Sequence, residues 1–378
     1  MPRPSIFIVG APKCGTTALY HCLRQHPGLY FPLSEDPARY WLCKEPGHFA
    51  GDLRMVEWLR IVGESDYLSL FADAAGDQRC GEATATYLFS HEAPLRIRNF
   101  TGGEARIIIM VRPPAEWMRS WHHDLLRYGY ENCSDFEKAL SLGERRDVGR
   151  SLPRRAAFAG CMNYRKLARF SNYIEHWLEV FGRERVFIGW QPDFQQDPEV
   201  FVSRLLDFLG LDPAEIPAAG RRNDSSILPG THLIDLWFGR MMARLPGGEK
   251  VARVFRKEVG HAYKEFVSSF FHPLSDRTIP EPLASRLKEE FADEEARLRQ
   301  LAGEGSDAWR QAPRWHSAWR GGARQPQVSD EALALGADIG LRQPQEVGGV
   351  DGEDHAAGEL RGVEQAAVAG DLDARPEQ

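Results

Sequence analysis

The sequence predicts an α/β fold, a three-layer sandwich in which a central parallel sheet is flanked by helices. Three short apolar runs carry this prediction, at residues 5–9, 106–111 and 186–190. Each run is followed by a glycine or proline turn and then by a helical pattern. Strands that are covered on both faces consist of continuous apolar runs, and strands that alternate with helices form parallel sheets. These observations together favour the layered architecture.

Helices are predicted between and after the strands. The segments 16–25 and 116–128 have helical apolar spacing and directly follow two of the strands. Asp197 and Pro198 supply an N-cap and a first-turn proline for a helix that extends to Leu209. Further helices are indicated by a capping box at Ser134–Glu137, by apolar spacing over 164–181 and by the helical stretch 231–309.

The 378 residues divide by composition into a folded part and an acidic tail. Hydrophobic residues make up 43% of the chain, which is enough for a large core. From Pro326 onward, twelve Asp and Glu stand against three Arg, and aromatic residues are missing. Such a segment cannot bury enough apolar surface to offset its ordering entropy. We therefore predict one folded domain over 1–315 and a disordered acidic tail over 316–378.

Charge and cysteine content narrow the environment in which the protein works. The folded part is only faintly basic, so we expect no nucleic-acid partner. The apolar run Ile6–Val9 is too short for a signal peptide or a membrane span. The six cysteines show neither close pairing nor metal-ligand spacing. We predict a cytoplasmic protein with no metal and no membrane span.

A glycine-rich loop, Gly10-Ala-Pro-Lys-Cys-Gly-Thr-Thr17, joins the first predicted strand to the first predicted helix. Such a turn offers backbone N–H groups and the positive end of the helix dipole to an anion. The loop nearly matches the phosphate loop of nucleotide-binding proteins, but Thr16 stands where that motif has its lysine. The lysine of this loop is Lys13, inside the turn. We expect a P-loop-like site that holds a 5′-phosphate without serving a γ-phosphate.

The second predicted strand ends in a cation. A nucleoside triphosphatase needs a carboxylate at the end of a neighbouring strand to hold Mg²⁺, whereas the run 106–111 leads into Arg112. A guanidinium at that place selects an anionic ligand directly, without a metal. Two alternatives stay open: a P-loop kinase or nucleoside triphosphatase, and a non-catalytic nucleotide-binding protein on the same fold.

These segments resemble the sulfotransferases that use 3′-phosphoadenosine-5′-phosphosulfate (PAPS), especially bacterial members akin to the heparan-sulfate type. Ala11–Leu19 is similar to the 5′-phosphosulfate loop of that family, and Val111–Ser120 to its 3′-phosphate motif. Cys43–Phe49 resembles the family's Lys-Glu-Pro-His-Phe-Phe segment, although Gly47 stands at the histidine position and His48 follows one place later. Weaker similarities lie at 81–87, 164–177, 207–210 and 298–309.

The resemblance implies a sulfotransferase that moves the sulfuryl group of PAPS to an acceptor hydroxyl, giving 3′,5′-adenosine bisphosphate and a sulfate ester. It implies that Lys13 stabilises the leaving phosphate and the bridging oxygen. It further implies a cofactor site that holds the 5′-phosphate with Cys14, Gly15, Thr16 and Thr17 and the 3′-phosphate with Arg112 and Ser120. Arg221 and Arg222 match only weakly a late basic loop that covers the 3′-phosphate in such enzymes.

The resemblance also implies how the acceptor is activated. Glu45 is the candidate general base, Lys44 keeps it ionised or assists the departing oxygen, and His48 is the rival base. Glu45, His48 and Tyr87 are expected to contact the acceptor, with Glu82 beside them. Tyr164 is a candidate to lie against the adenine, although an aromatic residue at the start of a helix is more often part of the core. Ordinary packing is the alternative for Glu82, Tyr87 and Tyr164. The acceptor itself, whether a sugar, a lipid or a small molecule, is left open.

Overall fold

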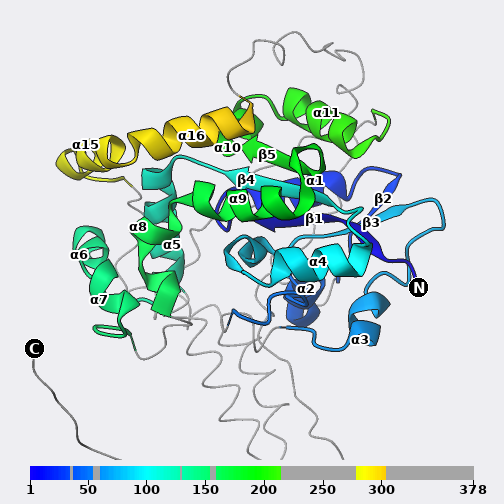
Figure 1. Cartoon of the computed structure of the whole chain (residues 1–378), viewed down its shortest axis with the longest axis horizontal. Helices are drawn as coiled ribbons and strands as arrows, with labels where there is room; N and C mark the ends of the chain where they lie inside the picture. The colour runs from blue at the N-terminus through cyan, green and yellow to red at the C-terminus, as the bar shows by residue number, and fades with distance from the viewer. Residues whose placement is uncertain (35–36, 54–59, 128–129, 154–158, 214–277, 304–378) are drawn as a thin grey trace, which may run out of the picture. The chain divides into compact units, whose positions relative to one another are not determined.

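Five strands of the described residues form one parallel sheet (Figure 1). The computed structural model describes residues 1–34, 37–53, 60–127, 130–153, 159–213 and 278–303. The strands are β1 (Pro4–Gly10), β2 (Leu29–Tyr30), β3 (Arg79–Glu82), β4 (Arg106–Val111) and β5 (Val186–Trp190). Their spatial order is β2-β3-β1-β4-β5, and every neighbouring pair is parallel. The predicted α/β fold with a central parallel sheet is confirmed.

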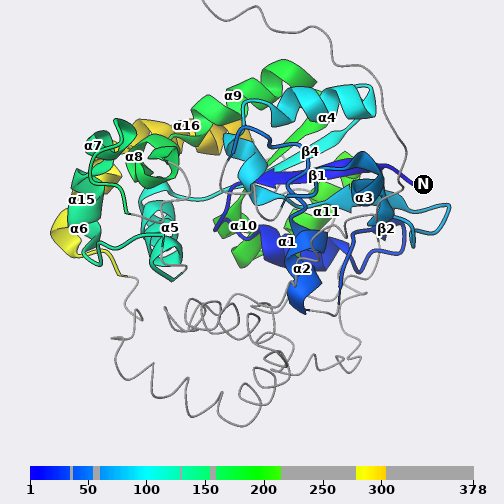
Figure 2. The ribbon, with the colours of Figure 1, turned by 90° about the horizontal axis from the view of Figure 1, so that it is seen from below.

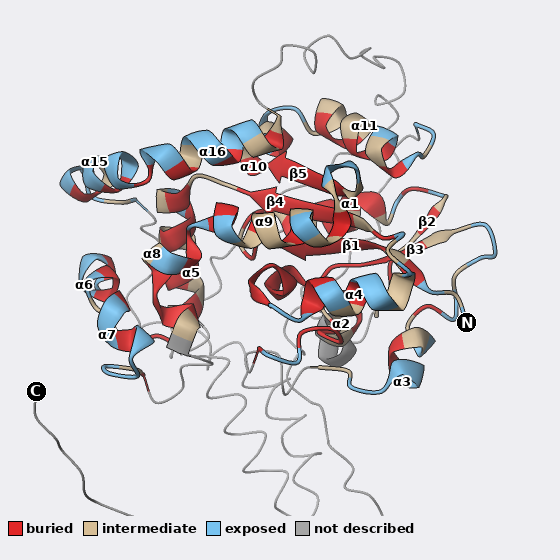
Figure 3. Ribbon diagram, viewed as in Figure 1, coloured by how far each residue is buried: buried red, intermediate tan, exposed pale blue. Residues whose placement is uncertain are grey.

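The central strands are apolar along their whole length because both faces of the sheet are covered. Ile6 to Val9 and Ile107 to Val111 have no exposed surface at all. The register of β4 and β5 pairs Ile107 with Val186 and Val111 with Trp190. Figure 3 shows the strands as the buried centre of the molecule, with exposed residues on the outer sides of the helices.

Helices lie on both faces of the sheet, as two views at right angles show (Figures 1 and 2). One face carries α4 (Ala93–Thr101) and α9 (Phe170–Phe181), and the other carries α1 (Thr16–Leu23) and α10 (Gln191–Gln196). The remaining described helices are α2 (Pro37–Lys44), α3 (Glu64–Ser69), α5 (Pro114–Arg127), α6 (Phe136–Ser141), α7 (Gly143–Asp147), α8 (Tyr164–Leu167), α11 (Pro198–Leu209), α15 (Glu281–Glu290) and α16 (Ala292–Ala302). Short 3₁₀ helices are η2 (Ala85–Phe89), η3 (Ala159–Met162) and η4 (Arg183–Arg185).

The predicted boundaries of β1, β4, β5, α1, α5 and α11 agree with the structure to within about two residues, whereas β2, α2, α3 and α4 were not predicted. Two predictions differ from the structure. The helix expected over 164–181 is wrong as one element, because the chain leaves helical geometry at Arg169 and starts again as α9. The predicted capping box is also wrong in detail. Asp135, rather than Ser134, caps α6, and its side chain accepts a hydrogen bond from the Lys138 amide at 2.8 Å.

The second start of α9 depends on a distant residue. Glu294 of α16 is buried and accepts hydrogen bonds from the Ser171 amide at 2.9 Å and from its hydroxyl at 2.7 Å. A carboxylate in the first turn of a helix satisfies an orphan donor and is favoured by the helix dipole. Helix α16 is thereby joined to the sheet layer, where the Arg299 guanidinium lies 4.7 Å from the Trp190 ring centroid.

None of the helices in the described ranges combines the length and the apolar character needed to cross a bilayer.

Some predictions fall on residues outside these ranges. The predicted domain boundary at 315 and 316, the acidic tail, and Arg221 with Arg222 all lie outside the described residues.

Candidate active site

The loop between β1 and α1 lies at the carboxyl edge of the sheet, where α/β proteins bind their ligands. It is held on one side by β4, because the Ala11 amide donates to the Met110 carbonyl at 2.7 Å. On the other side Gly10 lies against η2, and a Cβ at Gly10 would be only 2.5 Å from the Leu88 Cβ. Gly15 has a φ of 86°, in the left-handed region that glycine adopts freely. The glycines are therefore required by the geometry of this turn.

Helix α1 begins at Thr16 with its first amides available to a ligand. In the part of the chain that the structure describes, no side chain caps this end, and the first turn contains no acid. The first N–H groups of a helix lack intrahelical partners and carry a partial positive charge. Thr16 is buried and Thr17 is half-buried beside them. This arrangement suits a phosphate or a sulfate.

Arg112 and Lys13 are brought together at this loop. The Arg112 Nη1 donates to the Lys13 carbonyl at 3.2 Å, and its Nη2 forms an ion pair with Glu116 at 2.8 Å. Its Nε is buried and has no hydrogen-bond partner among the described residues. A second hydrogen bond joins α5 to this loop, since the Trp117 Nε1 donates to the Pro12 carbonyl at 2.8 Å. One donor of the guanidinium fork is thus buried and unused, as a site for an anionic ligand requires.

The Lys13 side chain extends toward helix α5. Its Nζ forms an ion pair with Asp124 at 2.7 Å, and both side chains are largely buried. Lys13 itself has a φ of 64°, an uncommon value for a residue with a side chain. Ser120 is half-buried and lies one helical turn before Asp124 on α5. Both predicted phosphate-binding cations therefore contact α5.

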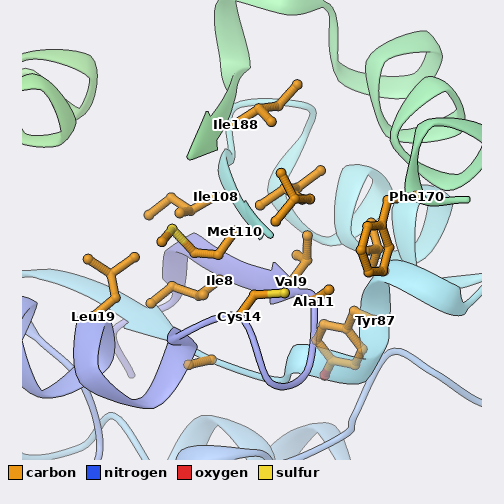
Figure 4. Packing of buried hydrophobic residues seen from close by; sticks show 14 of the residues in the cluster. Ile8, Val9, Ala11, Cys14, Leu19, Tyr87, Ile108, Met110, Phe170 and Ile188 are labelled. Carbon is orange, nitrogen blue, oxygen red and sulfur yellow. The ribbon is translucent and has the colours of Figure 1, made fainter. Parts of the chain in front are cut away.

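Cys14 differs from its predicted role. Its amide donates to the Ala11 carbonyl at 3.2 Å and so closes the turn instead of facing a ligand. Burial raises the pKa of its thiol to about 12, although the cations of Arg112 and Lys13 act in the opposite direction. Figure 4 shows the side chain packed among the buried residues of β1 and α1. Cys14 is a packing residue of the loop with an inert thiol.

The predicted base lies at the end of α2. Lys44 is the last residue of this helix, and its Nζ contacts the Glu45 Oε1 at 2.5 Å. The Lys44 side chain is fully buried, whereas 27% of the Glu45 side chain is exposed. Glu45 thus has solvent access and a fixed cation next to it.

His48 lies beneath the surface and does not take the position of a rival base. Its Nδ1 lies 2.8 Å from the Ile61 carbonyl, and its ring stacks on Tyr67 at a centroid distance of 4.4 Å. Burial lowers the pKa of His48, and the Ile61 carbonyl opposes this shift. The predicted acceptor contact of His48 is therefore not seen, because aromatic packing occupies the ring.

Two hydroxyl groups hold the segment that follows Glu45. The Thr84 Oγ1 accepts a hydrogen bond from the Gly47 amide at 3.2 Å, and the Tyr87 hydroxyl accepts one from the Phe49 amide at 3.2 Å. Tyr87 has no exposed surface. The structure therefore differs from the prediction that Tyr87 contacts the acceptor. Its hydroxyl instead holds the backbone of the segment after Glu45, through the Phe49 amide.

Glu82 ends β3 and is buried behind the same segment. Its Oε2 accepts a hydrogen bond from the Tyr67 hydroxyl at 2.5 Å. Burial raises the pKa of Glu82 from 4.5 to about 7, against the lowering effect of the hydroxyls around it, and the negative charge of Glu45 adds to the rise. Glu82 is therefore a supporting residue behind the predicted base and does not line an open pocket.

The raised pKa of Glu82 predicts a pH-dependent stability. The folded state holds this proton up to about pH 7, whereas the unfolded chain releases it near 4.5. Stability should therefore fall between these pH values, by about 3 kcal/mol in total. In Glu82→Gln this loss should be missing, so urea unfolding at pH 5 and pH 8 should show a smaller difference than in the wild type. Glu104→Gln, at a carboxylate that is 75% exposed, is the control. Equal pH dependence of Glu82→Gln and wild type would contradict the assignment.

Tyr164 is also part of the core and does not face a nucleotide. It is 1% exposed, and its hydroxyl donates to Glu131 at 2.5 Å. Arg146 binds the same carboxylate through both terminal nitrogens, at 2.8 and 2.9 Å. Core packing, the more frequent outcome for such a residue, is therefore what the structure has at Tyr164, since the ring and hydroxyl are enclosed.

Sequence reasoning did not identify Asp124 and Glu116 as parts of the site. Glu116 had a readable signal, since it lies four residues after Arg112 and such pairs meet on a helix. Asp124 contacts a residue 111 positions away, and nothing local indicates that contact. Within the described ranges, no group of three or more His, Cys, Asp or Glu side chains is placed to hold a metal ion.

The fold and this edge define a class: P-loop-like α/β proteins, in which a glycine-rich loop joins the first strand of a parallel sheet to the first helix. Comparison with known protein families agrees with this class of fold. The sulfotransferase domain model matches residues 3–222, more than half of the chain, and the chain belongs to the sulfotransferase family.

Relatives of known structure or function share this family. The chain is 29% identical to human carbohydrate sulfotransferase 15 over 56% of its own length and 44% of that protein. It is 26% identical to human heparan sulfate glucosamine 3-O-sulfotransferase 6, over 55% of its length and 52% of that protein. The chain thus spans about half the length of these curated relatives. The crystal structure of a sulfotransferase from Alicyclobacillus acidocaldarius superposes with a TM-score of 0.52 at 26% identity, covering 82% of this chain and all of that one.

Proposed function

We propose that this protein transfers the sulfuryl group of PAPS to an acceptor hydroxyl. The observation that carries the proposal is the meeting of Lys13 and Arg112 at one loop, on the carboxyl edge of the sheet. The uncapped start of α1 and the guanidinium of Arg112, which is 19% exposed, would provide donors for two separate anionic groups. A doubly phosphorylated adenosine has anions of this kind at its two ends. Among the described residues, β4 leads into Arg112, and the carboxylate that ends β3, Glu82, is buried and bonded to Tyr67. Neither strand that neighbours β1 therefore ends in an accessible acid for Mg²⁺, which disfavours a nucleoside triphosphatase.

The protein's contribution to this reaction is positioning and charge stabilisation. PAPS supplies an activated sulfuryl group whose transfer places negative charge on a phosphate oxygen. The amides of Thr16 and Thr17 at the start of α1 would hold the 5′-phosphate, and the ammonium of Lys13 would neutralise the charge on its oxygen. Arg112 and Ser120 would hold the 3′-phosphate, which fixes the adenosine from its other end.

Glu45 would remove the proton of the acceptor hydroxyl during its attack on sulfur. This side chain is the part of the Lys44–Glu45 pair that reaches solvent. A carboxylate that acts as general base must be ionised and within hydrogen-bond reach of the attacking group. Lys44 holds the carboxylate in place through its 2.5 Å contact, and the hydroxyls of Thr84 and Tyr87 hold the segment after it.

We propose a sugar hydroxyl as the acceptor. The two human relatives are named for carbohydrate and for heparan sulfate glucosamine, and the sulfotransferase domain match over residues 3–222 contains the residues that build the site. A panel of sugar, lipid and phenolic alcohols tested with labelled PAPS distinguishes this proposal from the other acceptor classes. Transfer to lipids or phenols alone would contradict it.

Calorimetric titration with 3′,5′-adenosine bisphosphate tests the cofactor site. The wild type should bind the bisphosphate, and Arg112→Ala should weaken binding by about 10- to 100-fold, because charged hydrogen bonds contribute about 1.5–3 kcal/mol. Arg3→Ala is the matched control, since Arg3 precedes β1 at the opposite edge of the sheet. Binding of ATP with Mg²⁺ in place of the bisphosphate would support the triphosphatase alternative and overturn the proposal.

A further inference from the structure

One face of helix α5 carries three polar residues at intervals of four. Glu116, Ser120 and Asp124 follow one another along this face, since residues four apart are neighbours on a helix surface. The two outer members are carboxylates, and each contacts one of the two cations at the loop. Ser120, the predicted 3′-phosphate ligand, lies between them. The helix that is proposed to bind the phosphates therefore also supplies competing anions.

The Asp124 contact is the stronger of the two. The Lys13 ammonium lies 2.7 Å from its carboxylate, and the two side chains are only 20% and 16% exposed. Low exposure reduces solvent screening, so this pair is more than a surface contact. The pair joins the loop to α5 across 111 residues of sequence, and it directs the lysine toward the helix.

The Glu116 contact is weaker and local. It is an i,i+4 pair, and the Glu116 side chain is 55% exposed. Pairs of this kind contribute little to stability, because water screens them and the long side chains lose entropy. Glu116 and Asp124 therefore have the same charge and share a helix face, and they differ in burial.

We propose that Asp124 is a positioning residue that holds Lys13 before the cofactor binds and yields it to the 5′-phosphate. The inference rests on the proposed function. One ammonium cannot fully serve two anions, and a carboxylate that stays next to a phosphate repels it. Asp124 therefore weakens the binding of the nucleotide and speeds its departure, while it keeps the lysine in place between turnovers.

Calorimetric titration of Asp124→Asn with 3′,5′-adenosine bisphosphate tests this role. The amide has the same shape and no charge, so affinity should rise on the order of tenfold, and stopped-flow displacement should show slower dissociation of the bisphosphate. Asp124→Glu retains the charge and should stay within about threefold of the wild type. Glu104→Gln, at a carboxylate that is 75% exposed and pairs with Arg185 away from the loop, is the control and should change affinity by less than about twofold.

A double-mutant cycle shows whether Asp124 acts through Lys13. In a Lys13→Gln background, the gain from Asp124→Asn should shrink to less than about twofold, because the competing pair no longer exists. A residue with only a structural role would change the unfolding midpoint without this coupling. Unchanged or weaker binding by Asp124→Asn, or an equal gain in both backgrounds, would overturn the inference. If the wild type binds no bisphosphate at all, the proposed function fails first.

Discussion

Replacing Glu45 by Gln is expected to lower kcat by about 10²- to 10⁴-fold, the usual contribution of a general base. The acceptor hydroxyl must lose its proton as it attacks, and the amide of Gln cannot accept that proton. Affinity for 3′,5′-adenosine bisphosphate should stay near that of the wild type, because Glu45 lies on a different segment from the phosphate-binding loop. Initial rates with labelled PAPS, together with calorimetric titration, measure both quantities.

The surrounding residues make this variant a clean test. Glu45 is partly exposed, so its replacement leaves no cavity, and the segment after it is held independently by Thr84 and Tyr87. Glu92→Gln, at an exposed carboxylate at the start of α4, is the control and should keep full activity. A Glu45→Gln enzyme with wild-type turnover would mean that another group takes the proton.

Replacing Arg146 by Met is expected to destabilise the fold by about 3–5 kcal/mol, since it leaves a buried carboxylate without its cation. The side chains of Arg146 and Glu131 are both fully enclosed. Burial alone would raise the pKa of Glu131, but the hydrogen bonds from Arg146 and Tyr164 outweigh it and lower that pKa. Urea unfolding followed by circular dichroism measures the loss.

An exposed pair provides the comparison for this variant. Arg286 of α15 pairs with Glu137 of α6, and about 60% of each side chain is exposed. Arg286→Met should change the free energy of unfolding by less than about 1 kcal/mol. Similar losses in the two variants would show that the Glu131–Arg146 pair is not the buried, unscreened contact that the structure describes.

The parts of the fold that the sequence predicted well are those governed by local pattern. The run 106–111 is the same segment as β4, because a strand covered on both faces has apolar side chains at successive positions, here Ile107 to Val111. The glycine loop and Arg112 were readable for a similar reason. Glycine at a strand-to-helix turn, and a cation where an acid would be needed, are features of a few adjacent residues.

The parts that were missed depend on contacts between distant segments. The break between α8 and α9 involves Glu294, which lies 123 residues from Ser171. Tyr87 follows β3 as a residue of an acceptor pocket would, yet its ring is enclosed and its hydroxyl meets a backbone amide from another loop. The spacing of residues in the sequence predicts which side chains are neighbours on one helix or strand. It does not predict which side chains become buried when distant segments pack together.

The contact between Glu294 and Ser171 has a practical consequence for anyone who shortens this protein. The recognised family segment ends at residue 222, but the carboxylate that starts α9 and the guanidinium over Trp190 both come from beyond residue 290. A truncation at the end of that segment would remove α16, which packs against the edge strand β5 and helix α9, and would leave the start of α9 without its carboxylate. The smallest autonomous unit is therefore longer than the homologous region, and a fusion should retain the chain through Ala302.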